Sequence, residues 1–358
     1  MSEVRAMLAD TVTRVFAAGI DKERITAAEE GAWLGDVWTA LETGGLTRPH
    51  VPEDAGGAGG TWLEAFVIAR AAGRHCVPLP VTETMLAAWL LAQAGMAVPD
   101  GPLAFAPALQ PLEKTLTASP FTATLRNVPW GRHAGHVVVV APRGERVLVG
   151  RARVAAAHVA VGHNVALEPR DTLVFAGEGL DEVGEAPLPG RIVEHYGAML
   201  RTAQMAGALD AILDMSVQYA SERVQFGRPI AKFQIIQQEL ARLAGWVAVA
   251  GSASEVAFRA ASEARPDAAG RIGAAGDPTF EIAAAKVVVG DAAEHGPRIA
   301  HQVHGAIGFT YEHALHFATR RLWAWRAEFG TPERWAQRLG AQVVGAGAAA
   351  LWPAITAR

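Results

Sequence analysis

The chain has 358 residues, 51% of them hydrophobic, which is enough for two or three domains and an extensive core. Its formal net charge is -4 and like charges never run in long blocks, which excludes the electrostatic signature of a nucleic-acid-binding protein or of a polybasic membrane surface. A single cysteine, Cys76, excludes an intrachain disulfide framework and any multi-cysteine metal site, and it fits a cytoplasmic protein.

Residues 1–100 are predicted to form an N-terminal helical domain. The opening stretch, residues 1–19, alternates charged and apolar residues at helical spacing and lacks the apolar core and cleavage site of a signal peptide. No apolar run in the chain reaches the roughly 18 residues that would span a bilayer, so no membrane segment is expected. Further helices are predicted from the periodicity of three segments: Trp33–Leu41, Trp62–Arg74 and Thr84–Ala94.

Residues 51–60 interrupt this helical pattern with several glycines and a proline, which predicts a loop because both residue types are unfavourable inside a helix. A phosphate cradle would need a preceding strand and a GxGxxG or GK[ST] spacing. Neither is present, so a plain connecting loop is favoured.

Residues 101–190 are predicted to form a small β domain, because short β-branched runs such as Val137–Val140 and Thr172–Phe175 are bounded by Gly, Pro or Asp. From residue 191 to 358 the pattern returns to long amphipathic helices. Apolar residues from Met205 to Tyr219 recur at helical spacing, which indicates core packing. Residues 262–278 are expected to form a loop between two helices.

Two motifs in the C-terminal part carry a resemblance to a known family. The first is Glu222–Gln234, read as ERVQFGRPIAKFQ, and the second is Gln302–Thr310, read as QVHGAIGFT. In this order and at this distance they resemble the acyl-CoA dehydrogenase flavoprotein family. The resemblance implies a mainly α fold with a central β domain: an N-terminal helical domain, a small β-barrel and a C-terminal four-helix bundle.

The same resemblance implies an FAD cofactor, an acyl-CoA substrate and an electron-acceptor flavoprotein. In the family the two motifs contact the FAD of a neighbouring subunit, which also implies a dimer or tetramer. The residues that carry over as cofactor-binding are Arg223, Gln225, Phe226, Gln302, Gly305, Ala306 and Thr331. Between Leu103 and Trp130 the flavin-lining segments that the family usually shows are not clearly present.

Dehydrogenation needs a base for the α proton of the acyl group. The family uses a glutamate, most often in a Glu-Gly-Thr step, where this chain has Phe329 before Gly330 and Thr331. In some members the glutamate comes earlier, at a position that corresponds here to Gly197. Glu328 is a candidate base one residue away, although one step rotates a helical side chain by about 100°. Weaker candidates are Glu194, Asp210 and Glu333.

Three other clusters of residues could carry chemistry or serve a structural role. The pairs His301 with His304 and His313 with His316 have a spacing that would share a helical face, but a metal site is disfavoured because further ligands are lacking. Cys76 follows His75, and a quiet thiol is favoured over a nucleophile. Three arginines on a Trp-rich segment fit either phosphate binding or an interface: Arg320, Arg321 and Arg326.

The leading hypothesis is therefore the α,β-dehydrogenation of an acyl-CoA in lipid, sterol side-chain or amino-acid breakdown. Two branches stay open: a base-lacking subunit of a heteromeric enzyme, and an active homomer that uses Glu328 or an unrecognised base. The alternative from another class is a catalytically inactive scaffold of the same fold that binds an acyl-CoA or a protein. A flavin monooxygenase or oxidase is a lesser possibility.

Overall fold

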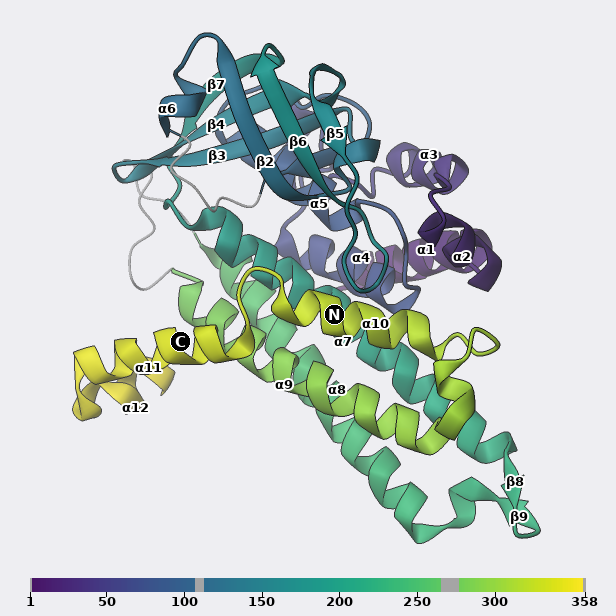
Figure 1. The fold of residues 1–358 in the computed structure, drawn as a ribbon. Helices are drawn as coiled ribbons and strands as arrows, with labels where there is room; N and C mark the ends of the chain where they lie inside the picture. The colour runs from purple at the N-terminus through teal and green to yellow at the C-terminus, as the bar shows by residue number, and fades with distance from the viewer. Residues whose placement is uncertain (1, 107–112, 265–276, 357–358) are drawn as a thin grey trace.

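The computed structural model describes residues 2–106, 113–264 and 277–356, and in it two helical regions flank a β domain (Figure 1). This order confirms the mainly α fold class with a central β domain. The helices of the first region are α1 (Glu3–Gly19), α2 (Lys22–Glu29), α3 (Gly35–Thr43), α4 (Trp62–Arg74) and α5 (Val81–Gln93). At the start of α4, the backbone N–H of Thr61 donates to the Glu64 carboxylate at 2.8 Å, so the predicted helix begins with a capping box.

The glycine-rich segment of residues 51–60 is a connecting loop, as predicted, with one short turn, η1 (Glu53–Ala55). Its backbone folds tightly on itself. A Cβ at Gly57 would lie 2.1 Å from the carbonyl oxygen of Val51, so only glycine fits there. The glycines of this loop are therefore explained by packing.

The β domain consists of two sheets and no closed barrel, where a small β-barrel was predicted. One is a 4-stranded sheet in the order β1-β3-β4-β7, and the other a 3-stranded sheet in the order β2-β6-β5. The strands are β1 (Leu103–Phe105), β2 (Phe121–Pro129), β3 (His136–Arg143), β4 (Arg146–Arg153), β5 (His158–Ala160), β6 (Arg170–Gly177) and β7 (Leu180–Ala186), with α6 (Glu113–Leu116) between the first two. Consecutive strands β2 and β3 lie in different sheets, and apolar side chains from both sheets share one core.

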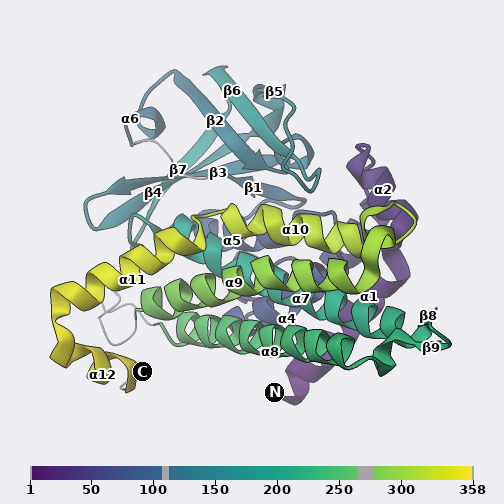
Figure 2. The same ribbon diagram turned by 60° about the horizontal axis from the view of Figure 1, so that its bottom comes forward.

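The C-terminal region is built on four helices that pack together: α7 (Ile192–Glu222), α8 (Gln234–Glu263), α9 (Thr279–His304) and α10 (Leu315–Ala327). Helices α11 (Pro332–Ala346) and α12 (Ala348–Thr356) extend from this bundle (Figure 2). The apolar stripe predicted on α7 is buried at Met205, Leu209 and Ile212. The predicted loop at residues 262–278 lies mostly outside the described residues.

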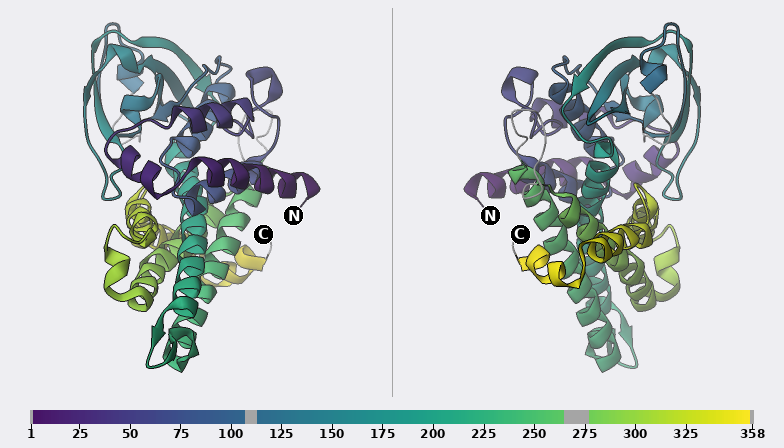
Figure 3. Two further views of the ribbon diagram at one scale, coloured as in Figure 1. Left: turned by 90° about the vertical axis from the view of Figure 1, so that its right-hand side faces the viewer. Right: turned by 90° about the vertical axis from the view of Figure 1, so that its left-hand side faces the viewer.

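Helices α4 and α7 cross at very short range, and this joins the N-terminal helices to the bundle (Figure 3). A Cβ at Gly207 would lie 1.8 Å from the carbonyl oxygen of Arg70, and one at Gly73 would lie 2.0 Å from that of Gln204. These two glycines therefore set how closely the regions approach. No helix in the described residues combines the length and the apolar content needed to cross a membrane.

Candidate functional site

The first motif forms an exposed hairpin at one tip of the bundle. After α7 ends at Glu222, strands β8 (Val224–Gln225) and β9 (Arg228–Pro229) pair around Phe226 and Gly227, whose φ angles are 52° and 77°. The Phe226 side chain is 92% exposed, and Arg223 and Gln225 are exposed as well. These residues face outward, so any ligand they hold would be shared with another surface.

The second motif lies at the same end of the bundle (Figures 1 and 2). Helix α9 ends at His304, and η6 (Gly305–Phe309) follows, beginning at Gly305 with a φ of 66°. Tyr219, one turn before the hairpin on α7, stacks on His304 with ring centroids 4.6 Å apart. Through this contact the two predicted cofactor motifs lie at the same end of the helical bundle.

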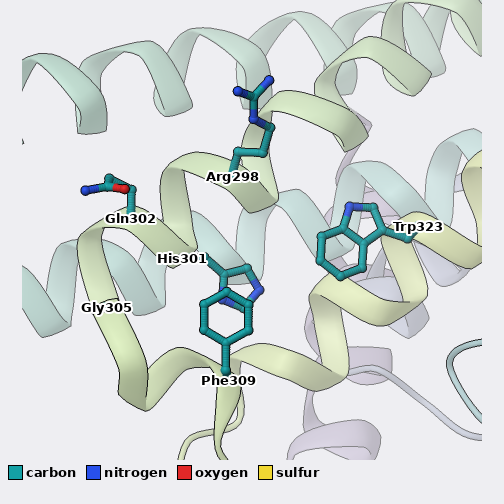
Figure 4. A pocket seen from close by; sticks show the side chains of 6 residues that line it. All are labelled: Arg298, His301, Gln302, Gly305, Phe309 and Trp323. Atoms are coloured by element: carbon teal, nitrogen blue, oxygen red, sulfur yellow. The ribbon is translucent and has the colours of Figure 1, made fainter.

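An open pocket of about 400 Å³ lies beside the second motif (Figure 4). The residues that line it are Arg298, His301, Gln302, Gly305, Phe309 and Trp323. A guanidinium, a carboxamide, a glycine backbone and aromatic rings are the groups that a dinucleotide needs, so the pocket fits part of an FAD. Among these residues, only Gln302 and Gly305 were predicted from the sequence to bind the cofactor. Arg298 precedes Gln302 by four residues on α9, and this spacing is the one signal that could have revealed it.

The candidate base Glu328 lies at the other end of α10, within a set of buried arginines. Arg201 donates from Nε to one carboxylate oxygen at 2.7 Å, and Arg170 donates from Nη2 to the other at 2.6 Å. Although burial opposes ionisation, these guanidinium groups lower the pKa of Glu328 to about 2. The carboxylate is thus ionised at neutral pH, has both oxygens occupied and is a weak proton acceptor.

The same arginines tie three parts of the chain together. Arg201 on α7 donates from Nη2 to Glu83 of α5 at 2.6 Å, and Arg170 of β6 donates to Glu168 at 3.1 Å. Glu168 also accepts from the indole N–H of Trp325 on α10 at 2.9 Å. Glu328 is therefore the link between the β domain, α5, α7 and the end of α10, a role that the sequence pattern did not reveal.

Phe329 and Gly197, the two positions that the sequence resemblance assigns to the base, face each other in this structure. Phe329, with a φ of 56°, lays its ring against Gly197 of α7, and a Cβ at Gly197 would lie 2.6 Å from that ring. The ring also approaches Phe105 of β1, with centroids 5.7 Å apart. An aromatic ring fills the space between the two positions, and neither position carries a carboxylate.

Thr331, the last predicted cofactor residue, belongs to the Glu328 side of α10. It is exposed and caps α11, where its hydroxyl accepts from the backbone N–H of Arg334 at 3.4 Å. In the described residues no recorded contact joins Thr331 to Gln302 or Gly305, and η6 and α10 lie between them along the chain. One chain therefore does not bring Thr331 together with the other predicted cofactor residues.

The weaker base candidates all have ion-pair partners. Glu194 accepts from Arg338 at 2.8 Å, and Asp210 accepts from Arg70 at 2.8 Å. Glu333 accepts from Arg326 at 2.9 Å. No contact between any of these carboxylates and the Phe329 ring is recorded in the described residues. The geometry therefore supports none of them as the base.

The arginines at the Trp-rich segment are paired with carboxylates. Arg320 and Arg321 both pair with Glu29 of α2, at 2.7 Å and 3.6 Å, and Arg326 pairs with Glu294 at 2.7 Å. Their charges are thus used within the chain, which favours a structural role over phosphate binding.

The remaining clusters also have structural explanations. Within the described residues, no group of His, Cys, Asp or Glu has the geometry to hold a metal ion. His301 shares a hydrogen bond of 3.1 Å with Thr319. Burial raises the pKa of the Cys76 thiol to about 11, so it is a quiet thiol at neutral pH.

Comparison with known proteins finds one family in both helical regions. The family models described as acyl-CoA dehydrogenase, N-terminal domain and C-terminal domain match residues 2–97 and 195–344. Among curated proteins, acyl-CoA dehydrogenase IpdE2 of Mycobacterium tuberculosis is 30% identical over 347 residues, which cover 95% of this chain and 98% of the relative.

Solved structures share the fold over nearly the whole chain. A variant of the Tcur3481-Tcur3483 steroid ACAD matches with a TM-score of 0.81 at 21% identity, covering 97% of this chain and 99% of that one. The ChsE4-ChsE5 complex from Mycobacterium tuberculosis matches with a TM-score of 0.75 at 19% identity, covering 96% and 97%. At these identities the likeness concerns the fold.

Proposed function

Because the chain belongs to the acyl-CoA dehydrogenase family, we propose that it is a subunit of an FAD-dependent enzyme that dehydrogenates an acyl-CoA thioester between its α and β carbons. The subunit lacks a catalytic base, and a second dehydrogenase-like subunit supplies one within a dimer or tetramer. The enzyme works in the cytoplasm and passes its electrons to an acceptor flavoprotein.

The contact between Phe329 and Gly197 carries the proposal. Both positions at which the family places its glutamate are occupied by residues without a proton-accepting group, and the ring of one fills the space beside the other. Glu328 does not replace the missing base, because two arginines hold its oxygens and lower its pKa to about 2. A carboxylate of such low basicity is poorly matched to an α proton.

The hairpin and the pocket are the part of the chain that serves the cofactor. Arg223 and Gln225 offer donors from the exposed hairpin, and the Phe226 ring stands out into solvent, where it can reach a neighbouring subunit. Gln302 and the backbone of Gly305 and Ala306 contribute from the end of α9. When bound, FAD would accept a hydride from the β carbon of the acyl group. Thr331 would meet a different part of the assembly.

Two solved neighbours with this fold support a two-component assembly. The name of each joins two components, Tcur3481 with Tcur3483 and ChsE4 with ChsE5, and the first is named a steroid ACAD. By analogy, we place this chain in a heteromer that acts on an acyl-CoA from sterol side-chain breakdown or from related lipid or amino-acid breakdown.

A catalytically inactive scaffold that binds an acyl-CoA or a protein is the second candidate. The paired charges around Glu328 and the filled space at Phe329 favour it, because such packing serves stability and needs no chemistry. The exposed hairpin argues against it, since a scaffold has no need to keep the Phe226 ring in water.

The visible spectrum of the purified chain, with FAD added, tests the proposal. We expect anaerobic addition of a panel of acyl-CoA thioesters to leave the flavin of the wild-type chain oxidised. Phe329→Glu should gain measurable bleaching, because a positioned base is worth on the order of 10²–10⁴-fold in rate. Phe329→Gln is the matched control, which has the same shape as the glutamate but no basic carboxylate.

Rapid bleaching of the wild-type chain alone, abolished by Glu328→Gln, would show a self-sufficient homomer and overturn the proposal. A chain that takes up no FAD, alone or with any dehydrogenase-like chain that co-purifies with it, would favour the scaffold. Bleaching that requires the co-purifying chain, and that is lost when the glutamate of that chain is replaced, is the result we expect.

A further inference from the structure

Lys286 is a fully buried lysine on α9. The chain uses arginine for 28 of its 32 basic residues and has lysine at four positions: Lys22, Lys114, Lys232 and Lys286. Of these four, only Lys286 is buried, with 0% of its surface exposed. Arginine keeps its charge in any protein environment, whereas lysine can lose its proton when it is buried. The residue type therefore indicates a site that can use a neutral amine.

The side chain of Lys286 holds the C-terminal end of α10. Its Nζ donates to the carbonyl oxygens of Trp325 at 2.9 Å and Arg326 at 3.0 Å, both in the last turn of that helix. No other hydrogen bond and no ion pair of this Nζ is recorded in the described residues. A neutral amine has two N–H groups for these two oxygens, whereas an ammonium would have a third one without a recorded acceptor. The contacts thus match the neutral form.

The same face of α9 also contacts the start of α11. Gly290 lies four residues after Lys286, and a Cβ there would lie 2.2 Å from Cγ of Pro332, the first residue of α11. The carbonyl oxygen of Gly290 accepts from Nε of Arg326 at 3.1 Å. One turn of α9 therefore contacts both helices that border residues 328–331.

The segment between these two helices has a backbone that needs support. Phe329 and Gly330 have φ angles of 56° and 99°, and the left-handed region is unfavourable for a residue as large as phenylalanine. The carbonyl oxygen of Phe329 accepts from the indole N–H of Trp335 at 3.0 Å. Residues 328–331 are therefore held at both ends by α9 and in the middle by Trp335.

We propose that Lys286 is a positioning residue for residues 328–331, and that it holds them as a neutral amine. The segment carries Phe329, so Lys286 determines how that ring lies against Gly197 and where a carboxylate introduced at position 329 would point. The inference rests on the proposed function in one respect, because that function identifies position 329 as the position of the base.

The charges around Lys286 agree with the neutral form. Burial is the main cause that lowers the pKa of Lys286 to about 7, and the guanidinium groups of Arg201 and Arg326 lower it further. The Glu328 carboxylate raises it, but both oxygens of that carboxylate already accept from arginines. Above about pH 7 most molecules therefore carry an uncharged amine at this position.

NMR of the full-length chain with labelled lysine side chains tests the protonation state. Because the chain has four lysines, the Lys286 signal is identified as the one that Lys286→Met removes, and it should titrate near pH 7. The free energy of unfolding of the wild type should also rise relative to Lys286→Met between pH 7 and pH 10.5, because the unfolded chain binds the proton over this range. Lys114→Met, at an exposed position on α6, is the matched control and should leave the Lys286 titration unchanged.

The indole N–H signal of Trp335 reports on the segment itself, and Trp335→Phe identifies it among the ten tryptophans. In the wild type this signal should shift as Lys286 titrates, with the same midpoint. In Lys286→Met the signal should move and the transition near pH 7 should disappear. His195 also titrates beside the indole, with ring centroids 5.2 Å apart, so a transition that persists in Lys286→Met belongs to His195.

A Lys286 signal that titrates near pH 10.5 would overturn the neutral amine. A Trp335 signal that ignores Lys286→Met, or whose transition persists in that variant, would overturn the positioning role. If Lys286→Met does not fold, His195→Gln decides: the transition should persist in it, and its loss would overturn the same role. Neither measurement uses FAD or turnover, so bleaching by the wild-type chain alone would disprove the missing base and leave these results unchanged.

Discussion

The pocket beside Gln302 (the pocket end) and the cluster around Glu328 (the Glu328 end) differ in how their polar groups are satisfied. The pocket end is lined by Arg298, His301, Gln302, Gly305, Phe309 and Trp323. There the described part of the chain records no hydrogen bond or ion pair for the Arg298 guanidinium, and the rings of Phe309 and Trp323 are exposed to water. The Glu328 end comprises Glu328–Thr331 with the arginines around them, and there each oxygen of the Glu328 carboxylate accepts from a guanidinium. Unsatisfied groups are available to a ligand, whereas groups satisfied within the chain hold the fold.

This difference bears on function, because the Glu328 end contains Phe329, the position that the sequence resemblance assigns to the base. A proton acceptor must be reachable and basic, and Glu328 is neither while Arg170 and Arg201 hold it. The pocket end keeps the requirements for a cofactor. The comparison thus separates cofactor binding, which we propose for this chain, from proton abstraction, which we assign to a partner.

Arg201→Met should have the largest effect on stability. It removes the guanidinium shared by Glu83 and Glu328 and leaves the buried Glu83 without its cation. Breaking a buried ion pair in this way costs about 3–5 kcal/mol, so the urea midpoint should fall sharply. Arg259→Met, which breaks an exposed pair on α8, is the control and should cost less than about 1 kcal/mol. Equal effects of the two substitutions would remove the contrast drawn here.

Glu328→Gln should lower the free energy of unfolding by about 1.5–3 kcal/mol at neutral pH, because the amide keeps the shape but loses two charge-assisted hydrogen bonds. The pKa of Glu328 in the folded chain is about 2, below its usual 4.5. A depressed carboxylate pKa stabilises the fold above the unfolded value, and this stabilisation is lost as pH falls through the folded one. The gap between variant and wild type should therefore close between pH 4.5 and pH 2, as acid titration of unfolding would show. A gap that is constant with pH would mean that the arginines do not lower the pKa.

Gly197→Ala should destabilise the fold by about 1 kcal/mol. The new methyl group would lie 2.6 Å from the Phe329 ring, an overpacking cost of about 1–3 kcal/mol that the better helix propensity of alanine partly offsets. In a Phe329→Leu background the same substitution should be neutral or slightly stabilising. A double-mutant cycle measured by urea unfolding gives the coupling, and a coupling near zero would mean that the two positions do not touch in solution.

The fold class could be predicted from the sequence because its signals are local. Helical periodicity from Trp62 to Arg74, β-branched runs and two family motifs each need only a short window of residues, and all are confirmed. The structure has two sheets where a small β-barrel was expected, because some strand pairs join distant segments: β2 pairs with β6 and β1 pairs with β3, and no short window reveals these pairs.

The candidate site was less predictable for the same reason. Phe329 and Gly197 could be aligned with the family separately, but their contact joins α7 to the end of α10. Arg170 and Arg201 come from β6 and α7, and nothing in the residues around Glu328 indicates that they converge on it. The assignments of Arg223, Gln302 and their motif neighbours to FAD stay predictions.

Phe226→Ala should have the smallest effect on the free energy of unfolding, in contrast to Arg201→Met, which should have the largest. Its ring is 92% exposed and contacts Phe233 only edge-on at 6.1 Å, so its loss should change the free energy of unfolding by less than about 0.5 kcal/mol. If the hairpin serves the cofactor of a neighbouring subunit, the FAD content of the assembled variant enzyme should nevertheless fall at least about tenfold. The measurement is flavin absorbance per chain. Met7→Ala, at a residue that is 65% exposed on α1, is the control and should leave both quantities unchanged. A stable Phe226→Ala protein with full FAD content would show that the ring is exposed for another reason. FAD binding would then be assigned to the pocket end without the hairpin.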